Sequence, residues 1–179
     1  MHRWGLLLIA GALASCVSST NPAFGPDTRV LPFASPAKFE LYERSDSRGS
    51  WTKKGTISFV ADANLVVRES SQQRWTYTFH AFEPRRFVIQ FRPGDEAPFS
   101  YGLLEIRNGE AFAKFVGCEN VDQTAFRAKG GLINRAEKGD FFSPTSRCLI
   151  DNISDRLAIL KWAFENFAPL DDWRLVPIK

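Results

Sequence analysis

Seven short runs between residues 38 and 116 alternate apolar with polar side chains, and this pattern constrains the fold more than any other sequence feature. Alternation with a period of two is typical of β-strands that bury one face. The connections between the runs are too short for crossover helices, so we expect antiparallel hairpins. The runs are Lys38–Glu43, Gly55–Ala61, Ala63–Glu69, Arg74–Phe82, Arg86–Arg92, Ser100–Arg107 and Glu110–Val116.

One of the expected hairpins can be placed in register. Asn108-Gly109 stands between two alternating runs, and this dipeptide favours a type I′ turn because both of its positions need a positive φ. A two-residue loop then pairs Arg107 with Glu110. The same register places six residues on one apolar face, namely Gly102, Leu104, Ile106, Ala111, Ala113 and Phe115.

A helix of about 14 residues is expected near the carboxyl end, capped by Ser154 and ending before Pro169. Its helical spacing predicts an apolar face made by Leu157, Leu160, Ala163, Phe164 and Phe167. Ile159 and Trp162 fall on the opposite side, so we consider them a candidate partner surface. A last strand-like run, Trp173–Ile178, follows.

These elements predict an α+β fold, in which the carboxyl-terminal helix packs on an antiparallel β-rich sheet, sandwich or barrel-like domain. The chain has 179 residues, of which 44% are apolar, so residues 37–179 are expected to form a single domain. A formal net charge of +3 is too small for a nucleic-acid footprint, and no nucleic-acid partner is expected.

The first fifteen residues have the layout of an export signal, with basic residues before an uncharged run from Trp4 to Ser15. The run is shorter than the roughly 20 residues of a membrane-spanning helix. Leu13-Ala14-Ser15-Cys16 resembles the lipobox of bacterial lipoproteins. That resemblance implies cleavage before Cys16, a diacylglyceryl group on its sulfur, and an acyl chain such as palmitate on the new amino end. The alternative is ordinary cleavage after the A-x-A site Ala12-Leu13-Ala14, which would release a soluble protein.

The number of cysteines favours the lipoprotein interpretation. The chain has three, and an exported protein with an odd cysteine needs an explanation. If Cys16 carries the lipid, Cys118 and Cys148 remain as a pair for a structural disulfide in an oxidising compartment. A redox or nucleophilic role for these two is disfavoured, because no Cys-x-x-Cys motif or neighbouring histidine accompanies them.

Residues 16–36 carry four prolines and are expected to form a lipidated cysteine followed by a semi-extended tether, within which Val30, Leu31 and Phe33 could dock locally. The residue after Cys16 is Val17 rather than aspartate, and the lipoprotein resemblance then implies the outer membrane, facing the periplasm. The sequence thus predicts a cell-envelope protein held to a membrane by its lipid.

The sequence contains no catalytic, cofactor-binding or metal-binding motif. His80 is the one histidine beyond the signal, which excludes a histidine-rich metal site. We therefore expect a non-catalytic module that binds an envelope protein or cell-wall material, without cofactor or metal. Two alternatives stay open: a lipocalin-like carrier of a small apolar ligand, and a small enzyme with a dispersed site around His80.

Overall fold

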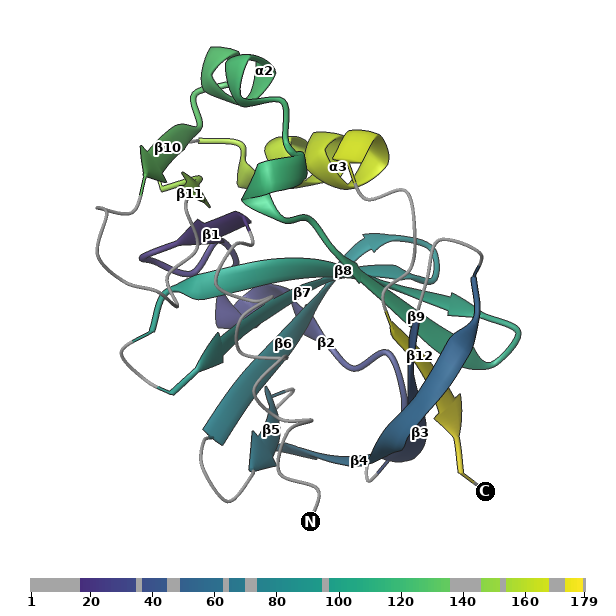
Figure 1. Ribbon diagram of the computed structural model, residues 1–179. Helices are drawn as coiled ribbons and strands as arrows, with labels where there is room; N and C mark the ends of the chain where they lie inside the picture. The colour runs from purple at the N-terminus through teal and green to yellow at the C-terminus, as the bar shows by residue number, and fades with distance from the viewer. Residues whose placement is uncertain are drawn as a thin grey trace.

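The fold is described from a computed structural model, shown in Figure 1. It describes residues 17–34, 37–44, 49–62, 65–69, 74–94, 97–135, 146–151, 154–167 and 173–178. The strands are β1 (Val17–Ser19), β2 (Arg29–Val30), β3 (Ala37–Arg44), β4 (Trp51–Asp62), β5 (Leu65–Glu69), β6 (Arg74–Glu83), β7 (Arg86–Pro93), β8 (Phe99–Arg107), β9 (Glu110–Phe115), β10 (Leu132–Arg135), β11 (Ser146–Leu149) and β12 (Trp173–Pro177). The helices are η1 (Pro26–Thr28), η2 (Cys118–Asn120), α2 (Gln123–Ala128) and α3 (Arg156–Phe167).

Eight of the strands follow one another in a circuit of antiparallel pairings. From β8 the pairings lead through β7, β6, β5, β4, β3, β12 and β9, and β9 also pairs with β8. Each of these strands therefore has a neighbour on both sides. The expected fold class, an antiparallel β-rich domain with a carboxyl-terminal helix packed on it, is confirmed.

An aromatic cluster lies on the inner side of this circuit. Three of its rings come from different strands, and Phe33 of the amino-terminal segment packs among them, with its centroid 5.3 Å from Phe39 and 5.5 Å from both Phe59 and Phe79. The buried members are Phe39, Ile57, Phe59, Phe79, Ile89, Phe91, Leu104, Ala111, Ala113 and Leu175.

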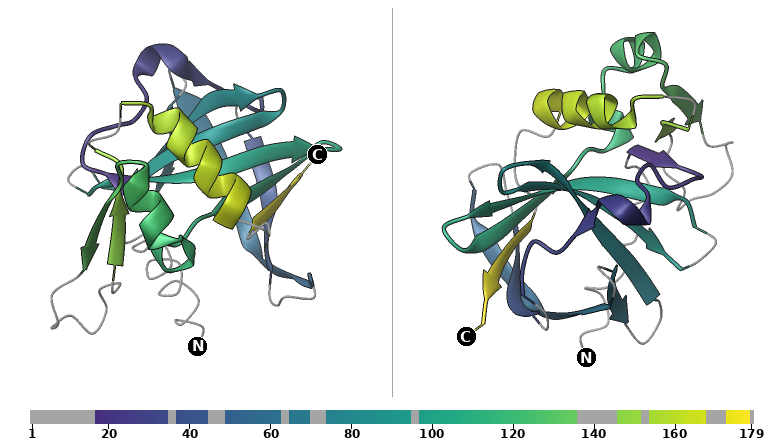
Figure 2. Two further views of the ribbon diagram at one scale, coloured as in Figure 1. Left: turned by 90° about the horizontal axis from the view of Figure 1, so that it is seen from above. Right: turned by 180° about the vertical axis from the view of Figure 1, so that it is seen from behind.

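A second cluster lies on the outer side, between the sheet and the helices. Figure 2 shows α3 lying across the strands on this side. Val88, Tyr101 and Leu103 of β7 and β8 form the floor, and Leu160 and Phe164 of α3 cover it. Burial of apolar area on both sides of β7 and β8 explains why these two strands combine inward-facing and outward-facing apolar residues.

The hairpin around Asn108-Gly109 has the predicted register. Arg107 lies opposite Glu110, and Gly102 lies opposite Phe115. Asn108 and Gly109 have φ values of 52° and 81°, as a type I′ turn requires. Seven predicted runs correspond to β3 through β9, and Trp173–Ile178 contains β12.

The predicted orientation of the last helix was wrong at two positions. Ile159 is 4% exposed inside the outer cluster, whereas Leu157 is 38% exposed. The reason is that α3 is covered from two sides, because Phe126 of α2 joins the same cluster as the sheet residues. The carboxylate of Asp155, rather than Ser154, caps the helix by accepting from the Ala158 N–H at 2.9 Å.

The expected tether was wrong as well, because its described part, residues 17–34, folds onto the domain. β1 pairs in parallel with β11 and antiparallel with β8, and β2 pairs with β6. Val17 and Ser19 are almost completely buried. Spaced prolines thus interrupt regular structure here without preventing the segment from packing. The docking expected for Val30, Leu31 and Phe33 is confirmed, since all three pack on the inner cluster.

The predicted disulfide between Cys118 and Cys148 is present, with a Cα–Cα distance of 5.4 Å. Both sulfur-bearing residues are fully buried. The bond joins η2 to β11, and Cys148 lies opposite Val17 in the ladder between β1 and β11. The disulfide therefore supports the strand that follows Cys16.

Candidate functional site

The amino-terminal arm, defined here as residues 20–28, lies over the outer side of β6, β7 and β8. Its central residue is Phe24, whose ring stacks on His80 with centroids 4.7 Å apart and an interplanar angle of 26°. The same ring meets Tyr101 edge-on at 6.4 Å. The arm therefore places one aromatic side chain over two buried polar residues of the sheet.

His80 is 2% exposed, and both of its ring nitrogens have hydroxyl partners. The Thr28 hydroxyl donates to the Gly25 carbonyl and so accepts from Nδ1–H of His80, over 2.9 Å. The Thr78 hydroxyl lies 3.0 Å from Nε2 and can donate to it. Burial, with the nearby positive charge of Arg29, lowers the pKa of His80 to about 4. The imidazole is therefore neutral at neutral pH and holds the arm to β6.

Gln90 and Tyr101 complete the attachment of the arm. Gln90 accepts from the Phe24 N–H at 3.1 Å through Oε1. The Tyr101 hydroxyl accepts from the Ala23 N–H at 3.0 Å and also bonds the Ser19 hydroxyl. Burial raises the pKa of Tyr101 to about 12, so this phenol stays protonated. Each buried polar side chain named here is satisfied by the arm or by a neighbouring strand.

The start of the arm is fixed by charged residues near α3. One oxygen of Asp151 accepts from the Thr20 N–H at 2.8 Å, the Thr20 hydroxyl at 2.7 Å and the Asn21 N–H at 3.3 Å. The Arg156 guanidinium donates to the Pro22 carbonyl at 2.9 Å and to the Asp151 carbonyl at 3.0 Å. Hydrogen bonds to charged groups are stronger than neutral ones, so this is a firm attachment.

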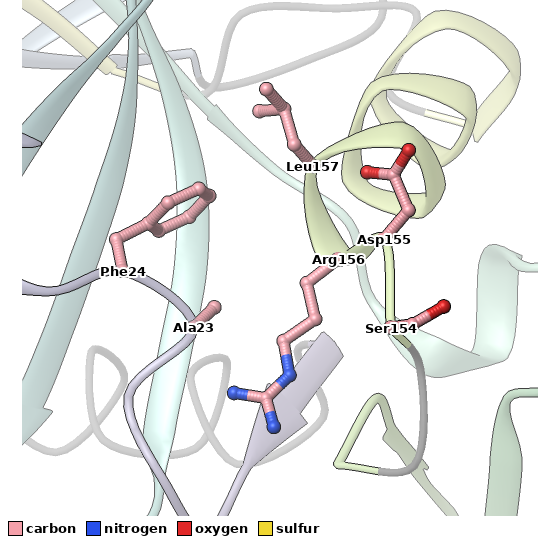
Figure 3. Close-up of a pocket in the computed structure, with 6 residues that line it drawn as sticks. All are labelled: Ala23, Phe24, Ser154, Asp155, Arg156 and Leu157. Carbon is pink, nitrogen blue, oxygen red and sulfur yellow. The ribbon is translucent and has the colours of Figure 1, made fainter.

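A pocket of about 440 Å³ lies between the arm and the amino end of α3. Figure 3 shows the Phe24 ring directed toward the helix, with Leu157 flanking the same opening. The lining residues are Ala23, Phe24, Ser154, Asp155, Arg156 and Leu157. The pocket is open to solvent and mainly polar, since Ser154, Asp155 and Arg156 line it together with Ala23, Phe24 and Leu157. It can therefore receive an apolar group only beside charged and hydroxyl groups.

The candidate residues named from the sequence have different positions and different degrees of exposure in the structure. Ile159 is buried and offers no surface, which corrects its assignment to a partner site. Trp162 is half-buried against the outer cluster, and the Lys129 ammonium lies 5.0 Å from its ring centroid. Cys16 lies outside the described residues. Phe24, which the sequence analysis left within a proline-rich tether, is the residue that the arm brings to the pocket.

Within the described parts of the chain, no group of three histidine, cysteine or acidic side chains is arranged to hold a metal ion. None of the described helices is long and apolar enough to cross a membrane. Comparisons with protein-family models, with curated protein sequences and with solved structures find no match to this chain.

Proposed function

We propose that this protein is a lipid-anchored, non-catalytic binding module of the bacterial cell envelope. The observation that carries the proposal is the position of the lipobox-like sequence directly before a buried strand. Val17 directly follows Cys16 in the sequence. Its side chain is 2% exposed, and its N–H donates to the Val116 carbonyl at 3.2 Å. A lipid on Cys16 would therefore hold the domain at the bilayer without an intervening spacer.

Two or more acyl chains provide stable attachment, because each buried methylene contributes about 0.8 kcal/mol. Val17 in place of an aspartate favours the outer membrane and a domain that faces the periplasm. The disulfide supports an oxidising compartment, where such bonds persist.

The binding surface in this proposal is the pocket between Phe24 and Leu157. β1 leads away from Cys16, and its three residues span about 10 Å before the arm begins. Ala23 and Phe24, which line the pocket, come after the end of β1 that is farther from Cys16. We expect an envelope protein to reach the pocket there. An apolar side chain of the partner would enter between Phe24 and Leu157, as anchor residues do in protein interfaces.

Two observations favour this function over the carrier and the enzyme. The aromatic rings on the inner side pack against one another. The ring centroids of Phe39 and Phe59 are 5.9 Å apart, and those of Phe33 and Phe59 are 5.5 Å apart. This packing supports a filled core rather than a ligand cavity. His80 is enclosed by two threonine hydroxyls and the Phe24 ring, and the two hydroxyls lie within hydrogen-bond distance of its two ring nitrogens. This arrangement supports a structural role.

The anchor is tested by mass spectrometry of the protein purified from its native host. We expect an amino-terminal Cys16 carrying a diacylglyceryl group and an added acyl chain. The variant Cys16→Ser should lose the lipid mass and leave the membrane fraction after washing at high salt. An unmodified Cys16 on the mature native protein would contradict the proposal.

The pocket is tested by photo-crosslinking in intact cells. A photoreactive side chain at Leu157 should link the protein to a discrete envelope protein, and Phe24→Ala should reduce this product. The matched control is Leu132, an equally apolar residue that is 44% exposed at the start of β10. Equal crosslinking from both positions would show that the pocket has no specific partner.

A further inference from the structure

A second surface lies on the side of the strand circuit away from the arm. It is the outer face of β9, β12, β3, the first half of β4 and the last residues of β8, called here the β3 face. β3 is four strands from β7 in either direction around the circuit. The described helices gather instead near β7 and β8, as Figure 1 shows. The β3 face and the pocket therefore point in roughly opposite directions.

Three half-buried aromatic residues stand on the β3 face, and each has a guanidinium group over its ring. The Arg107 guanidinium carbon is 3.9 Å from the Phe112 centroid. That of Arg44 is 4.8 Å from Trp51, and that of Arg174 is 5.8 Å from Tyr42. The Trp51 and Phe112 rings also meet edge-on at 6.2 Å. Cation–π contacts order these long side chains while they remain at the surface.

The β3 face is basic. Its described carboxylates are paired: Glu110 accepts from Nε and Nη2 of Arg174 at 2.8 Å, Glu105 lies 3.9 Å from Nε of Arg107, and Glu40 accepts from Lys53. The Arg174 pair lowers the pKa of Glu110. Among the described residues of this face, basic side chains outnumber acidic ones by six to three. The basic residues are Lys38, Arg44, Lys53, Arg107, Lys114 and Arg174, and the acidic ones are Glu40, Glu105 and Glu110.

The β3 face is continuous with the expected lipid attachment point. The Val17 N–H bonds the carbonyl of Val116, the residue that follows β9. Phe112 is four residues before Val116 on an extended strand, a separation of about 13 Å. A lipid on Cys16 would therefore enter the bilayer beside β9, at one edge of this face.

We propose that the β3 face lies against the anionic phospholipid headgroups of the membrane that anchors Cys16. This inference rests on the proposed lipid anchor. Tryptophan and tyrosine favour the membrane–water interface, and lysine and arginine are attracted to anionic lipids. When the β3 face lies on the membrane, the pocket between Phe24 and Leu157 faces away from it. The same orientation then allows membrane contact through the β3 face and partner binding at the pocket.

The first test uses the lipidated protein in vesicles of phosphatidylcholine with 30% phosphatidylglycerol and a spin label at shallow depth. We expect the label to quench Trp51. The variant Trp51→Phe should remove most of the quenched fluorescence, whereas Trp162→Phe, on α3, should leave it in place. Equal losses in both variants, or no quenching, would overturn the proposal.

The second test changes the charge of the β3 face. The double variant Arg107→Gln/Lys114→Gln should lower the ratio of docked to undocked protein about 25-fold, since each charge contributes roughly fivefold at an anionic surface. The matched control is Arg127→Gln/Lys129→Gln, which removes two exposed basic residues of the α2 region. Equal effects of the two pairs would contradict a specific face.

Failure of the orientation and failure of the anchor can be told apart. Lipidated protein with unquenched Trp51 would leave the anchor standing and reject the β3 face. Unlipidated native protein whose Trp51 is still quenched on added anionic vesicles would support the β3 face and reject the anchor. A concentration-dependent dimer in sedimentation that is lost in Trp51→Phe would assign the face to a second copy of the chain and overturn the proposal.

Discussion

The backbone N–H of Val17 donates to the carbonyl of Val116 over 3.2 Å, which joins the start of β1 to the end of β9. Val17 is also opposite Cys148 of β11. The residue that follows the expected lipidation site is therefore held by two parts of the chain that lie about 100 and 130 residues later. If Cys16 carries the proposed lipid, a pull on that lipid would act directly on the sheet.

Loss of the disulfide should destabilise the domain by about 3–4 kcal/mol, because the bond closes a loop with a sequence separation of 30. Urea unfolding with and without a reductant measures the difference. The double variant Cys118→Ala/Cys148→Ala should show the reduced stability and no response to reductant. A stability unchanged by reduction would mean that the packing around η2 and β11 is sufficient without the bond.

Acidification should destabilise the domain through His80. Its pKa in the folded protein is lowered to about 4, below the ordinary value of 6.5, so the unfolded chain binds the proton more readily. Protonation of His80 therefore lowers the free energy of unfolding. This loss of stability is absent well above pH 6.5, grows as the pH falls, and reaches about 3 kcal/mol below about pH 4.

The measurement is urea unfolding of the wild type and of His80→Gln at pH 7, 5.5 and 4. The difference in unfolding free energy between the two proteins should shift in favour of the variant as the pH falls. The other titrating groups are present in both proteins, so their contributions cancel in this difference. A constant difference would show that His80 has the same pKa in both states.

Removal of the Asp151 carboxylate should release the amino-terminal arm. Asp151→Ala replaces the acceptor of the exposed Thr20 and Asn21 donors by water, which should cost about 1 kcal/mol. Limited proteolysis should then cut within residues 20–25. Asp155→Ala is the matched control, since it removes only the cap of α3 at about 1 kcal/mol, and the arm should stay protected.

Gly102→Ala should strain the inner cluster. A Cβ at this position would lie 2.5 Å and 2.8 Å from two carbons of the Phe115 ring and 3.2 Å from the Lys114 carbonyl. We expect a loss of about 1–3 kcal/mol in thermal or urea unfolding. The second change Phe115→Leu should restore part of it, because a smaller side chain relieves the contact with the ring. Additive losses in the double variant would exclude this clash as the cause.

Local patterns predicted the strands from β3 to β9 and the register around Asn108-Gly109, because alternation and turn chemistry act over a few residues. The disulfide was predicted from the number of cysteines and the expected compartment. Each of these inferences needed only neighbouring residues or the odd number of cysteines, and the structure bears them out.

Local sequence patterns could not predict the packing of the amino-terminal arm or the orientation of α3. Phe24 stands between Pro22 and Pro26, and its partner His80 is more than 50 residues away, so no local pattern connects them. Ile159 is buried because α2 covers a second side of α3, a contact between segments that periodicity within one helix does not contain. The same holds for Trp51, whose neighbour Phe112 belongs to a distant strand.

The parallel pairing of β1 with β11 has a consequence for how the chain acquires its structure. β1 is synthesised before every other strand, yet its partner residue Cys148 follows Val17 by about 130 residues. Contacts of such long sequence separation form late, because a large loop must close before they contribute. The first strand to be made is therefore among the last to find its place, and until then its donors and acceptors are open to other chains.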